Sequence, residues 1–229
     1  MSCELVIFDC DGVLVDSEPI SNRVFTSALH ELGFDWTYDR VCRRFIGLSM
    51  PLCIEQIEEE LGCPVPDRFI GDLQRRTFEA FRRERLQAVR GVPQLLENLD
   101  MPFCVASSGE LEKMRVTLTL TGLLPRFEGR LFSAQQVRHG KPAPDLFLFA
   151  AEACGVVPGR CVVVEDSVPG VRAARAAGMT VFGYTERSDG AALAAHGAVV
   201  FESMMDLPRL ICERPDASKE ANRCVERGT

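Results

Sequence analysis

The chain has 229 residues, of which 46% are hydrophobic and 26% charged, and its formal net charge is −7. This acidity argues against a nucleic-acid-binding protein, because such proteins usually present a basic surface to the phosphate backbone. No run of 18 apolar residues occurs, so we expect no membrane span. The net charge also offers an anionic substrate no overall attraction, so local cations must hold any phosphate group.

The cysteine and histidine content bears on redox state and on metal binding. The ten cysteines are scattered without a CxxC pair, and Cys10, Cys104 and Cys161 lie in apolar segments. This spacing favours buried free thiols over a disulfide framework, and with only three histidines a zinc site is disfavoured. The N-terminal segment lacks the layout of a signal peptide, so we expect a cytoplasmic protein.

Short apolar runs predict the strands of a sheet. The first, residues 5–8, is apolar throughout, which is typical of a parallel strand buried on both faces. Helical patterns that end at Gly122, Gly155 and Gly178 separate several of the later runs. Those later runs lie at residues 103–106, 130–132, 161–164, 180–184 and 198–201. The alternation predicts an α/β protein with a doubly wound, Rossmann-like parallel sheet.

The segment between the first two strands breaks this alternation. It contains helical stripes at residues 20–32, 52–61 and 69–85 and no convincing strand. A connection of this length is too long for a simple link between a strand and a helix. We therefore expect an inserted α-helical cap domain at residues 16–90. The core domain would consist of residues 1–15 and 91–212, followed by a polar, frayed tail at 213–229.

Two aspartates, Asp9 and Asp11, follow directly on the first predicted strand. In extended backbone, residues two apart point to the same side, so their carboxylates would crowd together. Such crowding needs a cation or a shared proton. An Asx turn before Gly12 would explain Asp11 but not an aspartate on a buried strand. The pair therefore predicts a divalent metal site with one reactive carboxylate.

Polar groups also follow three later strands, where ligands bind in open α/β sheets. Ser107 and Ser108 follow the second strand, Lys141 follows the third, and Glu165 and Asp166 follow the fourth. Carboxylate oxygens suit Mg²⁺, while hydroxyl groups, backbone N–H groups and a lysine suit phosphate oxygens. Taken singly, these residues could equally be helix caps or surface side chains. Together they predict a site for Mg²⁺ and a phosphoryl group.

Four ordered segments, residues 9–18, 105–108, 141–145 and 164–171, resemble the motifs of the haloacid dehalogenase superfamily. More narrowly, they resemble its β-phosphoglucomutase-like and sugar-phosphatase branch, in which a helical cap is inserted at this position. One such motif would be weak, whereas four in order, each at a strand end, are specific.

The resemblance implies a role for each of these residues. Asp9 is the nucleophile, and Asp11 is the general acid and then the general base. The phosphoryl oxygens are held by Ser107 and Lys141, and Ser108 is expected to contribute its backbone N–H group. The implied ligands of Mg²⁺ are Asp9, Asp11 through its backbone carbonyl, Glu165 and Asp166.

The cap supplies further candidates for substrate contact: Ser17, Arg44, Gly47 and Arg76. For Ser17 a hinge or capping role competes with this interpretation, and for each arginine a solvated helix face does. The pattern at residues 44–47, with the start at Ser17 and Glu18, is similar to that of 6-phosphogluconate phosphatases of the superfamily.

We expect a Mg²⁺-dependent phosphatase that acts on a small phosphorylated metabolite, such as a sugar or sugar-acid phosphate, through an aspartyl-phosphate intermediate. The alternatives are a β-phosphoglucomutase-type phosphotransferase and a non-catalytic protein that binds phosphometabolites. Mutases of the family carry a histidine where this chain has residues 19–21, and an arginine where it has Leu48. Both intact aspartates disfavour the non-catalytic alternative. The sequence leaves open the exact substrate and whether the protein is a monomer or a dimer.

Overall fold

A computed structural model describes residues 3–45 and 48–213 of the chain. Its centre is a six-stranded, wholly parallel sheet in the order β3-β2-β1-β4-β5-β6. The strands are β1 (Leu5–Phe8), β2 (Phe103–Ser107), β3 (Leu131–Ser133), β4 (Cys161–Glu165), β5 (Thr180–Tyr184) and β6 (Val199–Phe201). The order reverses beside β1, so the ends of β1, β2 and β4 meet at the switch point of the sheet. The predicted α/β fold class is confirmed.

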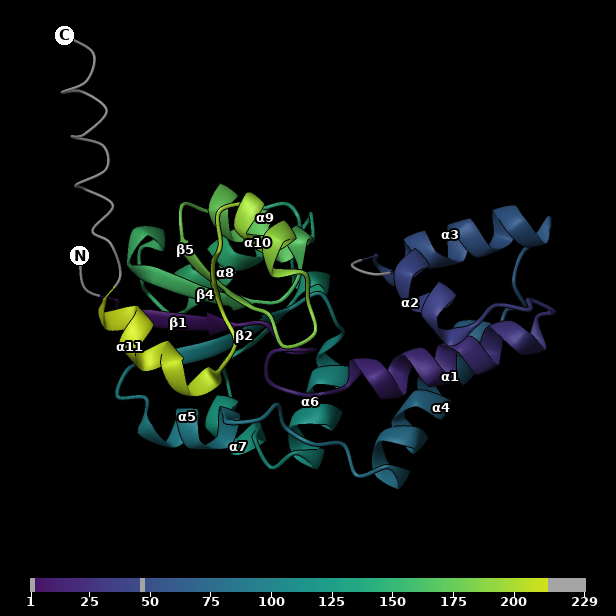
Figure 1. Cartoon of the computed structure of the whole chain (residues 1–229), viewed down its shortest axis with the longest axis horizontal. Helices are drawn as coiled ribbons and strands as arrows, with labels where there is room; N and C mark the ends of the chain where they lie inside the picture. The colour runs from purple at the N-terminus through teal and green to yellow at the C-terminus, as the bar shows by residue number, and fades with distance from the viewer. Residues whose placement is uncertain (1–2, 46–47, 214–229) are drawn as a thin grey trace, which may run out of the picture.

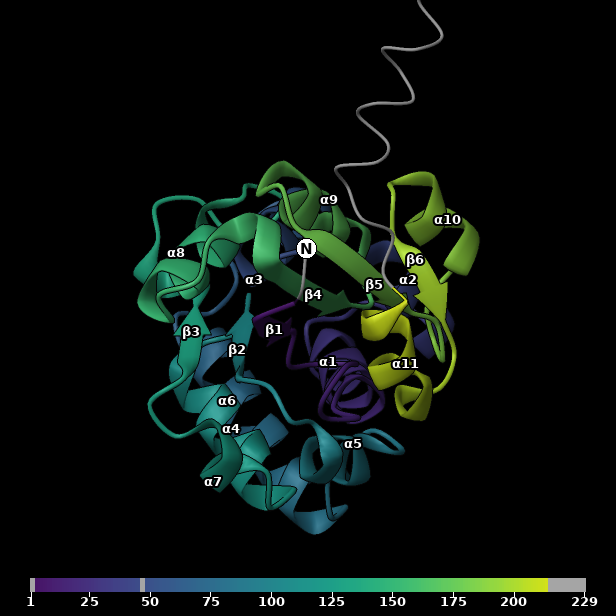
Figure 2. The same ribbon diagram turned by 90° about the vertical axis from the view of Figure 1, so that its left-hand side faces the viewer.

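Helices cover both faces of the sheet (Figures 1 and 2). One face carries α5 (Val92–Asn98), α6 (Leu111–Leu120), α7 (Leu124–Phe127) and α11 (Leu207–Cys212). The other carries α8 (Asp145–Ala153), α9 (Val168–Ala176) and α10 (Gly190–Ala195). Successive residues of β1 point to opposite faces, so Val6 and Phe8 pack in the first layer and Leu5 and Ile7 in the second. This double cover explains why β1 is apolar at every position.

Four of the helices between β1 and β2 form a lobe beside the sheet (Figure 1). They are α1 (Glu18–Glu31), α2 (Tyr38–Phe45), α3 (Met50–Leu61) and α4 (Phe69–Arg83). Most of their buried side chains form a cluster of their own, around Leu29, Trp36 and Ile57. We propose that this lobe, called the cap helices below, is the inserted domain expected at residues 16–90.

The observed elements depart from the predicted ones in small ways. β3 starts at Leu131 rather than at residue 130, and helix α2 has no counterpart among the predicted stripes. Only Val41 and Phe45 of α2 are buried, and one pair at helical spacing is too short a signal to predict a helix. Among the described residues, no helix is both long enough and apolar enough to cross a membrane. The predicted tail from residue 214 onward lies outside the described residues.

Candidate active site

Asp9 stands at the carboxyl end of the central strand β1. Its backbone N–H still donates to the carbonyl of Val164 on β4, at 2.9 Å, so the sheet holds its backbone in place. The residue is only 7% exposed. Burial raises the pKa of Asp9 from 3.8 to about 7, since the opposing effect of Lys141 is smaller. A buried carboxylate in this position calls for a cation.

Lys141 reaches the same strand ends from the loop before α8. Its ammonium group donates to Asp9 Oδ1 and to Glu165 Oε1, both at 2.5 Å, and to the carbonyl of Ala106 at 3.1 Å. The side chain is 3% exposed. Burial alone would lower the pKa of Lys141, but Asp9 and Glu165 outweigh it and raise the pKa. Lys141 is therefore a fixed positive charge between two strands of the sheet.

Glu165, at the end of β4, has hydrogen bonds to both of its carboxylate oxygens. Oε1 accepts from Lys141, while Oε2 accepts from the backbone N–H groups of Asp166 and Ser167 and from the Ser167 hydroxyl, at 2.9 to 3.0 Å. The residue is completely buried. These bonds differ from the expectation that Glu165 binds the metal. They fit a residue that orients Lys141 and the loop that follows β4.

Asp11 lies on the turn after β1 and is held from two directions. The ammonium group of Lys113 is 2.9 Å from its Oδ2, and the hydroxyl of Ser17 donates to its Oδ1. Burial raises the pKa of Asp11, but Lys113 and Ser17 together outweigh burial and hold the pKa below its usual value. Asp11 is therefore a carboxylate in this conformation. Ser17, itself buried, directly precedes α1 and so links the cap helices to this group.

Lys113 was not among the residues singled out in the sequence. It belongs to the first turn of α6, and Leu111 and Met114 beside it pack into the core below the sheet. Burial would lower the pKa of Lys113, yet Asp11 outweighs burial and raises it. The available signal was a lysine at the edge of an apolar helix stripe, six residues after Ser107. Such a lysine usually extends to solvent, so the pattern alone does not reveal the ion pair.

Asp166 completes the acidic side of the site. A Cβ atom on Gly12 would lie 2.1 Å from Asp166 Oδ2, so this carboxylate rests against the turn that carries Asp11. Gly12 also has a φ of +79°, which favours glycine. Burial raises the pKa of Asp166 well above its ordinary value, and Glu165 and Asp9 add to this. The close contact explains why a glycine follows Asp11.

These groups fit a divalent cation. Asp9 is buried and Asp166 is half-buried, and burial together with the neighbouring carboxylates raises the pKa of both groups, so a cation would stabilise their ionised forms. Within the described residues, no three Asp, Glu, His or Cys side chains form a ready-made metal cluster. Mg²⁺ does not need one, since it commonly takes one or two carboxylates and keeps water or substrate phosphate as its other ligands. Asp9, Asp166 and the backbone carbonyl of Asp11 are the residues that would hold it.

The loop after β2 lies on the other side of Asp11. Ser107 is buried, and its hydroxyl accepts a hydrogen bond from Gly109 N–H at 3.0 Å. A Cβ atom on Gly109 would be 3.3 Å from the Ser107 hydroxyl and 3.6 Å from Asp11 Oδ2. Ser133 on β3 supports the loop by donating to the carbonyl of Gly109. Ser108 is exposed beside it. The loop therefore brings a hydroxyl and backbone N–H groups to the aspartates.

The remaining cap candidates lie elsewhere. Arg44 pairs with Glu60 at 2.8 Å and lies over the ring of Trp36. Arg76 pairs with Glu31 at 2.7 Å and so ties α4 to α1. These contacts give both arginines a structural role within the cap helices, and their contact with substrate stays a prediction. Gly47 lies outside the described residues.

Comparisons with known proteins find a matching family model and several similar proteins. A family model described as haloacid dehalogenase-like hydrolase matches residues 3–178. The 6-phosphogluconate phosphatase of Escherichia coli is 31% identical over 90% of this chain and 94% of its own length. A phosphorylated carbohydrates phosphatase of Thermotoga maritima is 31% identical over 86% and 92%, respectively. A solved structure of a hydrolase from Deinococcus radiodurans, with bound phosphate and sodium, has a TM-score of 0.75 and 32% identity, over 92% of this chain and 96% of that one.

Proposed function

The chain belongs to the haloacid dehalogenase-like hydrolase family and is a phosphoric monoester hydrolase, and from this premise we propose that it is a Mg²⁺-dependent sugar-phosphate phosphatase with an aspartyl-phosphate intermediate. The observation that carries the proposal is the arrangement of Asp9, Lys141 and Asp11. One carboxylate on a rigid strand end has a buried ammonium group 2.5 Å away and a second carboxylate two residues further on. This is the arrangement that covalent phosphoryl transfer requires.

In the first step, an oxygen of Asp9 attacks phosphorus. The bond between phosphorus and the ester oxygen breaks, and Asp11 donates a proton to the alcohol that leaves. In the second step, water attacks the phosphorus of the aspartyl phosphate, and Asp11 accepts the proton of that water. The carboxylate of Asp9 and inorganic phosphate are released. An alcohol leaves poorly without a proton, whereas the carboxylate of Asp9 leaves readily, so one acid–base residue serves both steps.

Asp11 is held by Lys113 and Ser17 in the ionised form, which the second step needs. The first step needs the protonated form. Ser17 stands where the chain enters α1, so a movement of the cap helices changes the hydrogen bonding of Asp11. We therefore assign to the cap two tasks. It encloses the substrate, and it sets the protonation of Asp11 to the step in progress.

The charge on the transferring phosphoryl group is balanced from both sides of Asp9. Lys141 supplies a fixed positive charge, and Glu165 holds it in place. When bound to Asp9, Asp166 and the carbonyl of Asp11, Mg²⁺ would neutralise further charge on the phosphoryl oxygens. The Ser107 hydroxyl and the N–H group of Ser108 are proposed to hold the oxygens that remain.

The proposed substrate class is a phosphorylated sugar or sugar acid. It rests on relatives that cover most of the chain and are named for phosphorylated carbohydrates and for 6-phosphogluconate. The buried strand ends fix only the phosphate. We assign to the cap helices the selection of the rest of the molecule.

The test is release of inorganic phosphate from a panel of sugar and sugar-acid phosphates, with Mg²⁺ and with EDTA. We expect turnover with Mg²⁺ only, abolished in Asp9→Asn and unchanged in the matched surface variant Asp206→Asn. In Asp11→Asn, a phosphoryl adduct should accumulate with p-nitrophenyl phosphate, whose leaving group needs less help from Asp11, and be visible by intact mass spectrometry. Interconversion of two sugar phosphates without phosphate release would instead identify a phosphotransferase. Binding without either reaction would identify a non-catalytic protein.

A further inference from the structure

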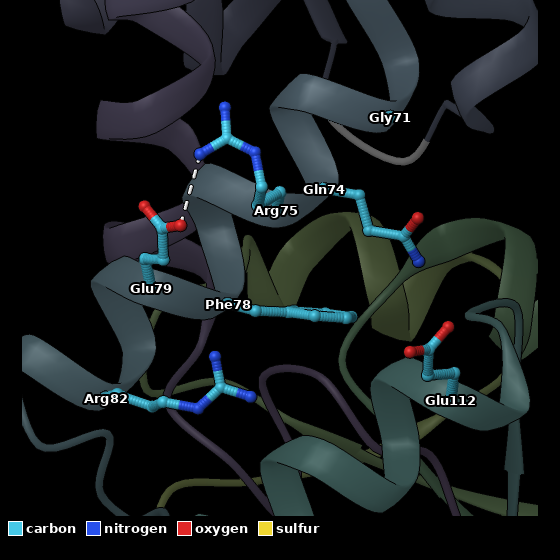
Figure 3. Close-up of a pocket in the computed structure, with 7 residues that line it drawn as sticks. All are labelled: Gly71, Gln74, Arg75, Phe78, Glu79, Arg82 and Glu112. Atoms are coloured by element: carbon cyan, nitrogen blue, oxygen red, sulfur yellow. Dashed lines mark hydrogen bonds and ion pairs between the residues drawn. The ribbon is translucent and has the colours of Figure 1, made fainter.

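A second groove lies between the cap and the domain of the sheet, and its lining contains none of the aspartates of the candidate active site. It runs between α4 and α6, and we call it the α4–α6 groove. Its walls are two facing helix stripes, with Gln74, Phe78 and Arg82 on α4 and Glu112, Arg115 and Thr119 on α6. Figure 3 shows Gln74, Phe78 and Arg82 projecting from α4 towards α6, with Glu112 across from them. Residues three and four apart share a helix face, so each stripe is continuous.

The composition of these stripes is unusual for helices that face each other. Facing stripes usually carry apolar side chains that interlock and leave no space. Here they are polar and charged around one aromatic ring, and they leave two adjoining hollows, open to solvent, of about 280 and 220 Å³ that share Arg82. Together the hollows have the size of a small-molecule site. None of the residues that line them belongs to the candidate active site.

One end of the groove is positively charged. Arg82 and Arg115 line the smaller hollow with Val116, Thr119 and Leu120, and this hollow has no acidic residue. In the described part of the chain, neither arginine has an ion pair with a carboxylate, although the protein carries an excess of seven acidic residues. Two exposed guanidinium groups from different helices line one hollow that has no acidic residue, which suits a phosphate that accepts several N–H groups from each.

The other end offers a ring surface and a hydrogen-bond acceptor. Phe78 is half-buried, and Phe81 lies nearly parallel behind it, with ring centroids 6.4 Å apart. Gln74 is bonded to Glu110 at 3.2 Å, which closes this end. Glu112 is exposed on α6 and, in the described residues, has no ion pair. A planar ring that carries an amino group could lie on Phe78 and donate to Glu112.

We propose that the α4–α6 groove binds a nucleotide-like ligand, with its planar, amino-bearing ring on Phe78 and its phosphate between Arg82 and Arg115. The ring and the phosphate bind at opposite ends of one groove. A ligand that carries both groups should therefore bind more tightly than a ligand that carries only one of them. The site is separate from the phosphoryl-transfer site and stands whether or not the proposed substrate class is correct.

Calorimetric titration of the full chain with adenosine 5′-monophosphate, in EDTA to prevent turnover, tests this inference. Two variants are tested. One combines Arg82→Gln and Arg115→Gln in the same chain, and the other is Phe78→Leu, which keeps the packing of the cap. The controls are Arg83→Gln, on the same helix but outside the groove, and Lys141→Ala, which removes the phosphate contact in the active site. Adenosine and inorganic phosphate are titrated separately, and circular dichroism checks that each variant is folded.

We expect adenosine 5′-monophosphate to bind the double arginine variant at least about tenfold more weakly, because each charged hydrogen bond that is lost costs a factor of this size. Phe78→Leu should weaken the nucleotide and leave inorganic phosphate unchanged, while both controls bind as the wild type does. Three results would overturn the inference: no binding to the wild type at millimolar concentration, binding that is lost in Lys141→Ala but kept in the double variant, and equal affinity for the nucleotide and inorganic phosphate.

Discussion

Lys113 is the residue whose charge holds Asp11 in its ionised form. Replacing it with methionine removes a contact of 2.9 Å and leaves burial to raise the pKa of Asp11. We expect Lys113→Met to lower kcat by about tenfold to a hundredfold, as for a mispositioned acid–base residue. The acidic limb of the pH profile for hydrolysis of the aspartyl phosphate should move to higher pH, because this second step needs ionised Asp11, which then needs a higher pH to lose its proton.

Lys113→Arg keeps the positive charge and is the matched variant. It should retain the position of the acidic limb even if the rate falls. An unshifted limb in Lys113→Met would mean that Lys113 acts only through packing.

The raised pKa of Asp9 predicts that the effect of Mg²⁺ on the stability of the fold depends on pH. Its pKa in the folded, metal-free protein is about 7 rather than 3.8, so the folded state binds this proton more tightly than the unfolded chain does. The stability of the metal-free protein therefore falls as pH rises from about 4 to about 7. A bound cation stabilises the ionised form of Asp9 in the folded protein. Mg²⁺ should therefore raise Tm more at pH 8 than at pH 5.5. Thermal unfolding with and without Mg²⁺ measures this difference.

Asp9→Asn is the control for that measurement, since asparagine has no proton to lose. The dependence of the Mg²⁺ effect on pH should become smaller in this variant, and the part that remains is the contribution of Asp166. A Mg²⁺ effect of equal size at both pH values in the wild type would exclude Asp9 from the cation site.

Some residues of the site can be predicted from the sequence around them, and others cannot. Asp9, Asp11, Lys141 and Asp166 follow predicted strands, and parallel strands end at one edge, so their convergence could be expected from the sequence. The role of Glu165 could not, because it depends on Lys141 lying 2.5 Å from Oε1 and on three donors at Oε2. The pairing of Lys113 with Asp11 spans 102 residues and has no sequence pattern of its own.

At the scale of the element, the first turn of α9 packs directly against the carboxylate of Glu165. A Cβ atom on Gly170 would lie 1.9 Å from Oε1 of Glu165, the oxygen that accepts from Lys141. Gly170→Ala must therefore displace either the helix or Glu165. We expect a loss of about 1–3 kcal/mol in the free energy of unfolding, as for an overpacked core, together with a fall in kcat. Chemical denaturation and steady-state kinetics measure the two effects.

Gly71→Ala provides a matched change on α4, where a Cβ atom meets nothing within 4 Å. There the free energy of unfolding should rise by about 0.5–1 kcal/mol, because alanine favours a helix over glycine. If Gly170→Ala were as harmless as Gly71→Ala, the tight contact between α9 and Glu165 would be wrong.

The elements themselves were predictable where their apolar pattern was long or buried on both faces. β5 has the predicted bounds, and α3 and α4 lie within two residues of their predicted stripes. α2 and β3 were harder, since each buries only two or three residues and a short run carries little periodic signal. The predicted family membership is confirmed by the model match and by the relatives.

At the scale of the whole molecule, the cap helices have a hydrophobic cluster that is separate from the two layers around the sheet. Ile57 is completely buried in the cap cluster. Ile57→Ala leaves a cavity there and should destabilise the cap helices by about 2–5 kcal/mol. Since the sheet has its own core, amide hydrogen exchange should rise across α1 to α4 and stay unchanged in β1, β2 and β4.

The same variant separates the two tasks of the molecule. We place the chemical steps on the sheet and the enclosure of the substrate on the cap. Ile57→Ala should therefore lose more activity towards a sugar phosphate than towards p-nitrophenyl phosphate, because the leaving group of the latter needs less help from Asp11. Leu5→Ala, in the layer below α8 and α9, is the reciprocal change and should raise exchange throughout the sheet. Equal exchange in both lobes after Ile57→Ala would show that the cap and the sheet unfold as one unit. The proposed division of the chain at residues 16 and 90 would then not separate two independently stable parts.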